Sequence, residues 1–289
     1  MGTWSGGRVG LIALVAAVIG VAVGAWISGR PMAGQAQSYQ APRLKGTDKP
    51  DLTGIWQAFT AANWDIQDHS AEPGPFPRLL GVWGAQHPGQ GVVEGNDIPY
   101  RPEALAKKQE NLKNRLTIDH DNLNTVGDPE AKCYLPGVPR ATYLPFPFQI
   151  LQSTDRVVIA YQFANASRTI PLGKASEPPV DFWMGWSNGH WEGDTLVVDV
   201  KGFNDMTWFD RAGNFHSDAL HVVERYTPMS PYHLTYEATI DDPKVFTRPW
   251  KMTMPLYRRV EKNLQLLEFK CVDLSEEYLY GGLVKQSSQ

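Results

Sequence analysis

From residue 51 onward, short runs of alternating apolar and polar residues are separated by turn-forming residues. An alternation with a period of two is typical of β-strands with one buried face. In the run 219–227, for example, Leu220, Val222, Glu224 and Tyr226 share one face, so a carboxylate lies among apolar neighbours. The pattern predicts a chain built mainly from β-strands.

The runs and the turns between them predict a series of antiparallel hairpins. We expect strands at residues 51–57, 146–152, 157–163, 195–200, 219–227, 234–240, 250–259 and 264–271. Consecutive hairpins at this spacing favour an up-and-down sheet that curls into a barrel. Residues 102–116 predict one soluble helix, because Pro102 suits the first helical position and Leu105, Leu112 and Leu116 share a face. That helix should pack on the barrel as a lid or plug.

The stretch from Asp181 to Tyr226 combines several apolar runs with polar loops. Asn188-Gly189 lies between two short apolar segments, and this dipeptide favours the type I′ turn of a hairpin. Residues 183–187 should therefore pair with residues 190–191. The loop 202–217 that follows the next strand carries polar residues that are candidates for a site.

The N-terminus contains twenty consecutive uncharged residues, 9–28, flanked by Arg8 and Arg30. Twenty residues in a helix span the ~30 Å hydrocarbon core of a bilayer. We expect residues 1–30 to form a transmembrane anchor, with a signal sequence cleaved after Ala36 as the alternative. Residues 31–50 are a polar tether and residues 51–289 an exported domain. The protein should be single-pass in the cytoplasmic (inner) membrane, with its C-terminal domain in the periplasm or outside.

Small residues recur every four positions in the apolar segment, at Ala16, Gly20 and Gly24. Such spacing lets a second helix approach closely, so these residues could dock a partner helix. The alternative is that small residues are simply common in membrane helices and signal sequences.

Composition and motifs exclude several classes of function. The chain of 289 residues has a net charge of −4, and its 27 Lys and Arg are scattered among 31 Asp and Glu, whereas a nucleic-acid binder would show a basic stripe. The sequence has no Ser-His-Asp order, Gly-rich phosphate loop, Cys-x-x-Cys or haem attachment motif. The polar cluster of Asp119, His120, Asp121 and Asp128 could ligate a hard metal, but its spacing lacks the glycine and terminal glutamate of an EF-hand loop. We therefore predict no metal, and we predict no cofactor.

Cys133 and Cys271 are the two cysteines of the chain. In an exported domain, two cysteines predict one disulfide that ties an early segment to the C-terminal strand. If the domain faced the cytoplasm, both thiols should be free.

The polar residues of the loop 202–217 provide the candidate chemistry. His216 with Asp210 or Asp205 could form a base and its orienting carboxylate. Arg225 and Trp208 could hold an anionic or aromatic ligand. The alternative is that the aspartates cap turns by accepting hydrogen bonds from their own backbone, as short polar side chains do.

Several segments resemble an uncharacterised family of bacterial exported proteins, among them KCYLPGVPRATYLPFPFQI, WEGDTLVVDVKGFNDMTWFD and HSDALHVVERY. This resemblance covers most of the chain after residue 50 and implies an exported β-rich domain. A weaker similarity to lipocalin-like barrels rests on Gly54-x-Trp56 at the first strand and on the run of hairpins.

Three functions are consistent with these observations. The first is a membrane-anchored periplasmic lipocalin-like barrel that binds a hydrophobic or aromatic small molecule, with Trp56, Trp183, Trp208 and Arg225 as ligand-binding residues. The second is an isomerase, hydratase or cyclase that uses His216 and Asp210 for proton transfer. The third is an accessory subunit of a respiratory or photosynthetic membrane complex.

Overall fold

A computed structural model describes residues 39–74, 84–115 and 127–272, and all its elements lie within the unit Gln40–Gln289. Nine strands form one antiparallel sheet: β1 Gly54–Ala58, β4 Phe148–Gln152, β5 Arg156–Tyr161, β6 Ser167–Pro171, β7 Trp186–Glu192, β8 Thr195–Lys201, β9 His221–Ser230, β10 His233–Asp241 and β11 Trp250–Arg258. Each strand lies beside its neighbour in this series, so the sheet is an up-and-down meander.

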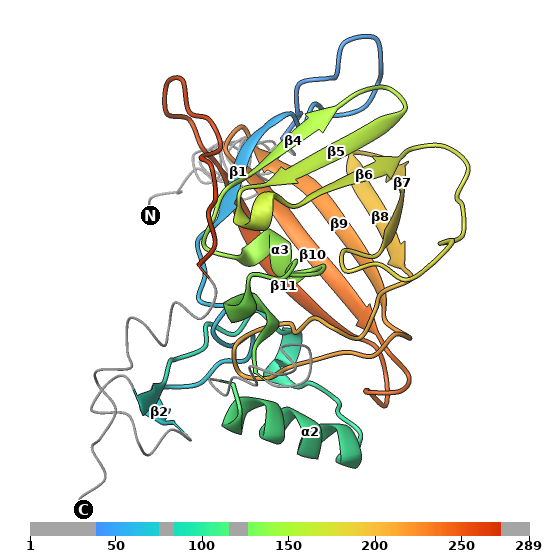
Figure 1. Ribbon diagram of the computed structural model, residues 1–289. Helices are drawn as coiled ribbons and strands as arrows, with labels where there is room; N and C mark the ends of the chain where they lie inside the picture. Colours follow the sequence, from blue (N-terminus) through green and yellow to red (C-terminus); the bar gives the residue numbers. More distant parts are fainter. Residues whose placement is uncertain (1–38, 75–83, 116–126, 273–289) are drawn as a thin grey trace, which may run out of the picture. The chain divides into compact units, whose positions relative to one another are not determined.

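The sheet curls into a nearly closed barrel (Figure 1). β1 pairs with both β4 and β11, so the first and last strands are joined by hydrogen bonds. β6 and β7 are the two ends of the strand order and share no hydrogen-bonded ladder. We call the line along which these two strands adjoin the seam. The mainly β, barrel-forming architecture predicted from the alternation is confirmed.

The alternation along the strands determines which side chains face the barrel interior. On β9, β10 and β11 every second side chain is buried, and the residues between them are more exposed. The inward residues of these strands are Val222, Glu224, Tyr226, Leu234, Tyr236, Ala238, Ile240, Trp250, Met252, Met254 and Leu256. Apart from Glu224 and the two tyrosine hydroxyls they are apolar, so their burial is the main stabilising contribution of this part of the barrel.

Trp56 of β1 is buried near the end of the barrel where β1 begins and β11 ends. Its indole Nε1 donates to the Leu52 carbonyl at 2.9 Å, and the Arg258 guanidinium lies 4.2 Å from the centre of the ring. Gly54 has a φ of 149°, and a Cβ there would collide with Arg258. The Gly-x-Trp pattern is therefore explained by a cation–π contact: the Arg258 guanidinium reaches the Trp56 ring through the space that a side chain at Gly54 would fill.

The other end is covered by the segments before β4, between β8 and β9, and between β10 and β11 (Figure 1). These segments carry the helices η2 Glu94–Asn96, α2 Pro102–Lys113, η3 Pro129–Lys132 and α3 Arg140–Tyr143, and the small strands β2 Glu72–Pro73 and β3 Ala85–Gln86; η4 Phe163–Asn165 follows β5. Buried Arg140 donates to Asp128 at 2.8 and 2.9 Å and to Glu130 at 2.8 Å, which fixes α3 on η3.

The predicted helix exists, but it uses a different face. α2 buries Ala104 and Asn111, whereas Leu105 is 43% exposed. Asn111 Nδ2 donates to the Gly213 carbonyl at 3.2 Å, and a Cβ on Gly213 would lie 2.7 Å from Lys108 O. The helix thus packs on the loop between β8 and β9, where a glycine allows close approach.

Three details of the strand prediction need correction. Asn188-Gly189 does not form a turn, because β7 runs straight through it and the hairpin turn lies at Gly193. Residues 264–271 form no strand, and the strand at 167–171 was not expected. Gly189 is needed for close packing instead: a Cβ there would lie 2.6 Å from Ile170 Cγ2 across the seam.

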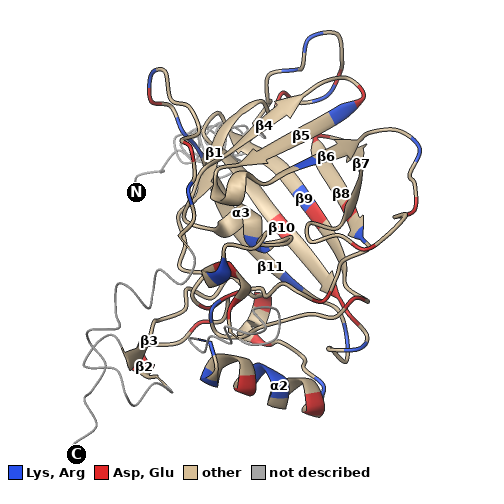
Figure 2. Ribbon diagram, viewed as in Figure 1, with Lys and Arg blue, Asp and Glu red and all other residues tan. Residues whose placement is uncertain are grey.

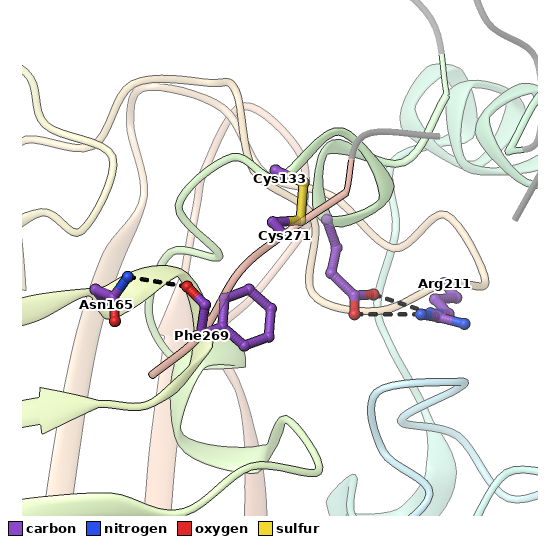
Figure 3. The surroundings of a disulfide bond; sticks show 6 residues. Cys133, Asn165, Arg211, Phe269 and Cys271 are labelled. Carbon is purple, nitrogen blue, oxygen red and sulfur yellow. Dashed lines mark hydrogen bonds and ion pairs between the residues drawn. A yellow bond between two sulfur atoms is a disulfide. The ribbon is translucent and has the colours of Figure 1, made fainter. Parts of the chain in front are cut away.

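The predicted disulfide between Cys133 and Cys271 is confirmed (Figure 3). It holds the segment after β11 against the barrel wall. Near it, Asn165 Nδ2 donates to the Phe269 carbonyl at 3.2 Å, and the Phe269 ring contacts Phe163 with centroids 4.8 Å apart.

The predicted anchor, its Ala16, Gly20 and Gly24 face, and the cluster at Asp119–Asp121 lie outside the described residues. Within the described ranges, no helix has the length and apolar character needed to cross a membrane.

Candidate functional site

A buried ion pair lies inside the barrel. Arg168 of β6 and Glu224 of β9 are 6% and 0% exposed. Arg168 Nη2 donates to Glu224 Oε1 at 2.9 Å, and Arg168 Nη1 lies 2.6 Å from Glu224 Oε2. Removing two charges from water costs several kcal/mol for each ion, and only good geometry and further hydrogen bonds offset that cost.

Two tyrosines supply further hydrogen bonds to the same carboxylate. The hydroxyls of Tyr226 and Tyr236 donate to Glu224 Oε1 at 2.9 and 2.8 Å, and the Tyr226 hydroxyl accepts from Arg168 Nη2 at 3.0 Å. Burial, followed by the negative charge of Glu224, raises the pKa of both tyrosines well above the usual value. Both hydroxyls therefore stay protonated and serve as donors.

Among the described residues, three polar atoms of this cluster make no hydrogen bond of normal geometry, although the Tyr161 hydroxyl lies close to Thr142 and Arg168. They are Arg168 Nε, the Tyr161 hydroxyl and the Thr142 hydroxyl, and each belongs to a buried side chain. Arg168 Nη1 and Glu224 Oε2 contact each other without hydrogen-bond alignment. A buried donor that stays unpaired costs ~1–3 kcal/mol, so three in one place call for a specific explanation.

The strand register explains how these residues meet. Glu224 of β9 pairs with Val198 of β8, and Val198 pairs with Gly189 of β7. Along this row of paired residues, the residue next to the seam is therefore a glycine. Arg168 lies on β6, on the other side of the seam, and reaches Glu224 across this row. Tyr161 of β5 and Thr142 of α3 complete the group, which we call the interior cluster: Thr142, Tyr161, Arg168, Glu224, Tyr226 and Tyr236.

The interior cluster combines an ion pair with polar atoms that make no hydrogen bond of normal geometry to the described residues. It offers an N–H donor and two hydroxyls that can donate or accept. Burial raises the pKa of Tyr161 as well, although Arg168 opposes the shift. The buried side chains around the cluster are mostly apolar.

The predicted pair His216 and Asp210 does not share a hydrogen bond. Both side chains are buried in the loop between β8 and β9. His216 Nδ1 donates to the Ser217 carbonyl at 2.9 Å, and its Nε2 accepts from the Thr207 hydroxyl at 2.6 Å. Burial lowers the pKa of His216, in keeping with a neutral ring. Asp205 is exposed.

Asp210 instead organises the loop. Its two oxygens accept from the backbone amides of Ile66, Ala212 and Asn214 at 3.0, 2.9 and 3.2 Å, and from Asn214 Nδ2 at 2.6 Å. Burial, followed by the charge of Asp65, raises the pKa of Asp210 to about 7. These contacts are of the kind expected from a residue that caps a turn.

The four predicted ligand residues are scattered. Trp56 is buried at the end of the barrel that Arg258 covers, while Arg225 faces outward and pairs with Glu192 at 2.8 Å. Trp183 packs on Tyr134 with ring centroids 5.1 Å apart, and Trp208 forms an isolated bridge with Phe215. The structure does not bring these residues together around one site.

A shallow hollow of about 340 Å³ lies on the outer side of the seam. It is lined by the segment that follows β6 and by β7 and β8, including Ser176, Asn188 and Lys201. Ser176 is fixed there because its amide donates to Asn188 Oδ1 at 2.9 Å and its carbonyl accepts from Asn188 Nδ2 at 3.0 Å. This hollow is polar and open, unlike the interior cluster.

Charges elsewhere do not indicate another site. In the view of Figure 2, Lys and Arg alternate with Asp and Glu and form no basic face. The described part of the chain contains no group of three or more His, Cys, Asp or Glu side chains that could hold a metal ion. Comparisons of the chain with models of protein families, with curated proteins and with solved structures found no match.

Proposed function

We propose that this domain is a lipocalin-like binding protein, held at the periplasmic side of the membrane by its N-terminal segment, that takes up a small and mostly apolar molecule with one polar end. The observation that carries the proposal is the unpaired Arg168 Nε, Tyr161 hydroxyl and Thr142 hydroxyl of the interior cluster. In an otherwise apolar barrel these atoms would bind the polar end of the ligand, and the aliphatic and aromatic side chains would contact the rest.

The seam offers a route into the barrel. Parting two paired strands breaks a ladder of hydrogen bonds, whereas β6 and β7 share no ladder. Parting them instead separates Arg168 from Glu224 and Asn188 from Ser176. Because Arg168 lies on β6 itself, a ligand that enters here meets the interior cluster directly.

Native mass spectrometry of the full-length protein, purified without extraction by organic solvent, tests the proposal. We expect a bound small molecule in the wild type. Tyr161→Phe should lower its occupancy about ten-fold, which corresponds to ~1.4 kcal/mol for the loss of one hydrogen bond to the ligand. This variant removes a hydroxyl that makes no hydrogen bond of normal geometry to the described residues, so the fold should persist.

Arg225→Met provides the matched control, because Arg225 is on the same strand as Glu224 but faces outward. Occupancy should be unchanged. If Arg225→Met releases the molecule while Tyr161→Phe retains it, or if the wild type carries none after exposure to a cell extract, the interior cluster is not the binding site.

The location is tested separately. The full chain should stay with the membrane fraction after alkaline carbonate washing, as expected for a spanning helix, and protease added to spheroplasts should digest the domain. Release of a product that begins after Ala36 would favour the signal sequence instead.

A further inference from the structure

The interior cluster is electrically balanced. Arg168 carries one positive charge and Glu224 one negative charge, and the two side chains contact each other. An uncompensated ion in such a site would have to give up its hydration without gaining a counter-ion, which costs several kcal/mol. The site therefore disfavours a ligand with a charged end.

The unpaired atoms also define what the ligand must offer. Arg168 Nε can only donate, and the hydroxyls of Tyr161 and Thr142 can donate or accept. A carbonyl oxygen accepts from such donors, and an alcohol can in addition donate to a neighbouring oxygen. Building on the proposed function, we infer that the barrel selects ligands with a neutral carbonyl or hydroxyl end and rejects the carboxylate of the same skeleton.

A change of charge within the site should reverse this preference. Glu224→Gln keeps the side-chain shape, and its carbonyl oxygen still accepts from the hydroxyls of Tyr226 and Tyr236. In this variant Arg168 has no counter-ion, so an anionic ligand can neutralise its charge. Glu237→Gln is the matched control, because Glu237 lies on β10 but pairs with Lys251 on the outer wall at 3.2 Å.

Three probes that share a phenyl ring test the inference: benzyl alcohol, acetophenone and benzoate, titrated into the full-length protein at neutral pH with a detergent blank. The wild type and Glu237→Gln should bind the two neutral probes at least about ten-fold more tightly than benzoate. In Glu224→Gln the affinity for benzoate should rise by at least about ten-fold and that for the neutral probes should not.

A wild-type measurement makes the test independent of whether the variant folds. Binding of benzoate should strengthen as the pH falls through the carboxyl range of about 4, because the neutral acid then replaces the anion. Equal affinity for benzoate and the neutral probes at neutral pH would overturn the selectivity while leaving the binding function intact. Failure of all three probes to bind at any pH would count against a barrel that takes up small, mostly apolar molecules, and so against both proposals.

Discussion

Gly189 of β7 packs directly against Ile170 of β6, at the one place where the nine-stranded meander lacks a hydrogen-bonded ladder. A methyl group at Gly189 would lie 2.6 Å from Ile170 Cγ2 and 2.9 Å from Leu172 Cδ2. The close packing of the seam at this point therefore depends on the absence of a side chain, while the ion pair of Arg168 with Glu224 also joins its two sides.

Gly189→Ala should consequently destabilise the barrel by ~1–3 kcal/mol, the usual cost of overpacking. The control is Gly173→Ala, since Gly173 has no atom within 4 Å of the added methyl group. Urea unfolding followed by tryptophan fluorescence measures both variants. Equal midpoints for the two would show that the seam relaxes without cost.

Two tyrosines of the interior cluster should respond differently to loss of the hydroxyl. Tyr236→Phe removes a hydrogen bond to the buried Glu224 carboxylate and should cost ~1.5–3 kcal/mol of unfolding free energy. Tyr161→Phe removes a hydroxyl that makes no hydrogen bond of normal geometry to the described residues and should leave stability unchanged or raise it. If Tyr161→Phe lowered the free energy of unfolding as much as Tyr236→Phe, the Tyr161 hydroxyl would be hydrogen-bonded within the protein and would not be available to a ligand.

The disulfide joins residues that are 138 positions apart. In the chain-entropy model, closing a loop of this length stabilises the folded state by ~4–5 kcal/mol. The double variant Cys133→Ser, Cys271→Ser should therefore lower the urea midpoint, and a reductant should do the same to the wild type. The reductant should not affect the double variant, and an effect there would show that it acts elsewhere.

Asp210 should make stability depend on pH. Folding raises the pKa of Asp210 from its ordinary value of 3.8 to about 7, so the unfolded state releases its proton first as the pH increases. The folded state is favoured fully below pH 4 and loses this contribution as the pH rises toward 7, by a few kcal/mol at ~1.4 kcal/mol for each pKa unit.

Asp210→Asn should remove this decline, which a comparison of urea midpoints between pH 4 and pH 7.5 detects. The comparison with the wild type is needed because the lowered pKa of His216 acts in the opposite sense, with stability lost as the pH falls through its usual range near 6.5. Parallel pH profiles for the two proteins would mean that Asp210 is ionised throughout.

The barrel could be predicted because most of its strands alternate buried apolar residues with more exposed polar residues. The alternation of Leu234, Tyr236 and Ala238 on β10 marks an inward face, and turns of a few residues favour neighbouring pairing. β6 was not predicted because Arg168 lies at an inward position where an apolar residue is expected. Residues 264–271 are apolar in part, but they bind the barrel through Phe269 and the disulfide and not through a ladder.

The interior cluster was harder to predict than the fold. Glu224 gave a signal, since a carboxylate on an apolar strand face needs a partner. The identity of that partner depends on which strands adjoin across the seam, and Arg168 is 56 residues away along the chain. The turn predicted at Asn188-Gly189 was wrong for a related reason. The sequence does not distinguish a glycine that permits close packing between strands from a glycine that permits a turn.

The bond between Cys133 and Cys271 also makes most of the domain a covalent ring, with β4 to β11 inside it and β1 outside. A protease that cuts the exposed residues 173–177 would leave two fragments that migrate as one species until the bond is reduced. Damage to that segment would therefore be invisible on a gel run without reductant, and the nicked protein would keep both halves of its barrel together.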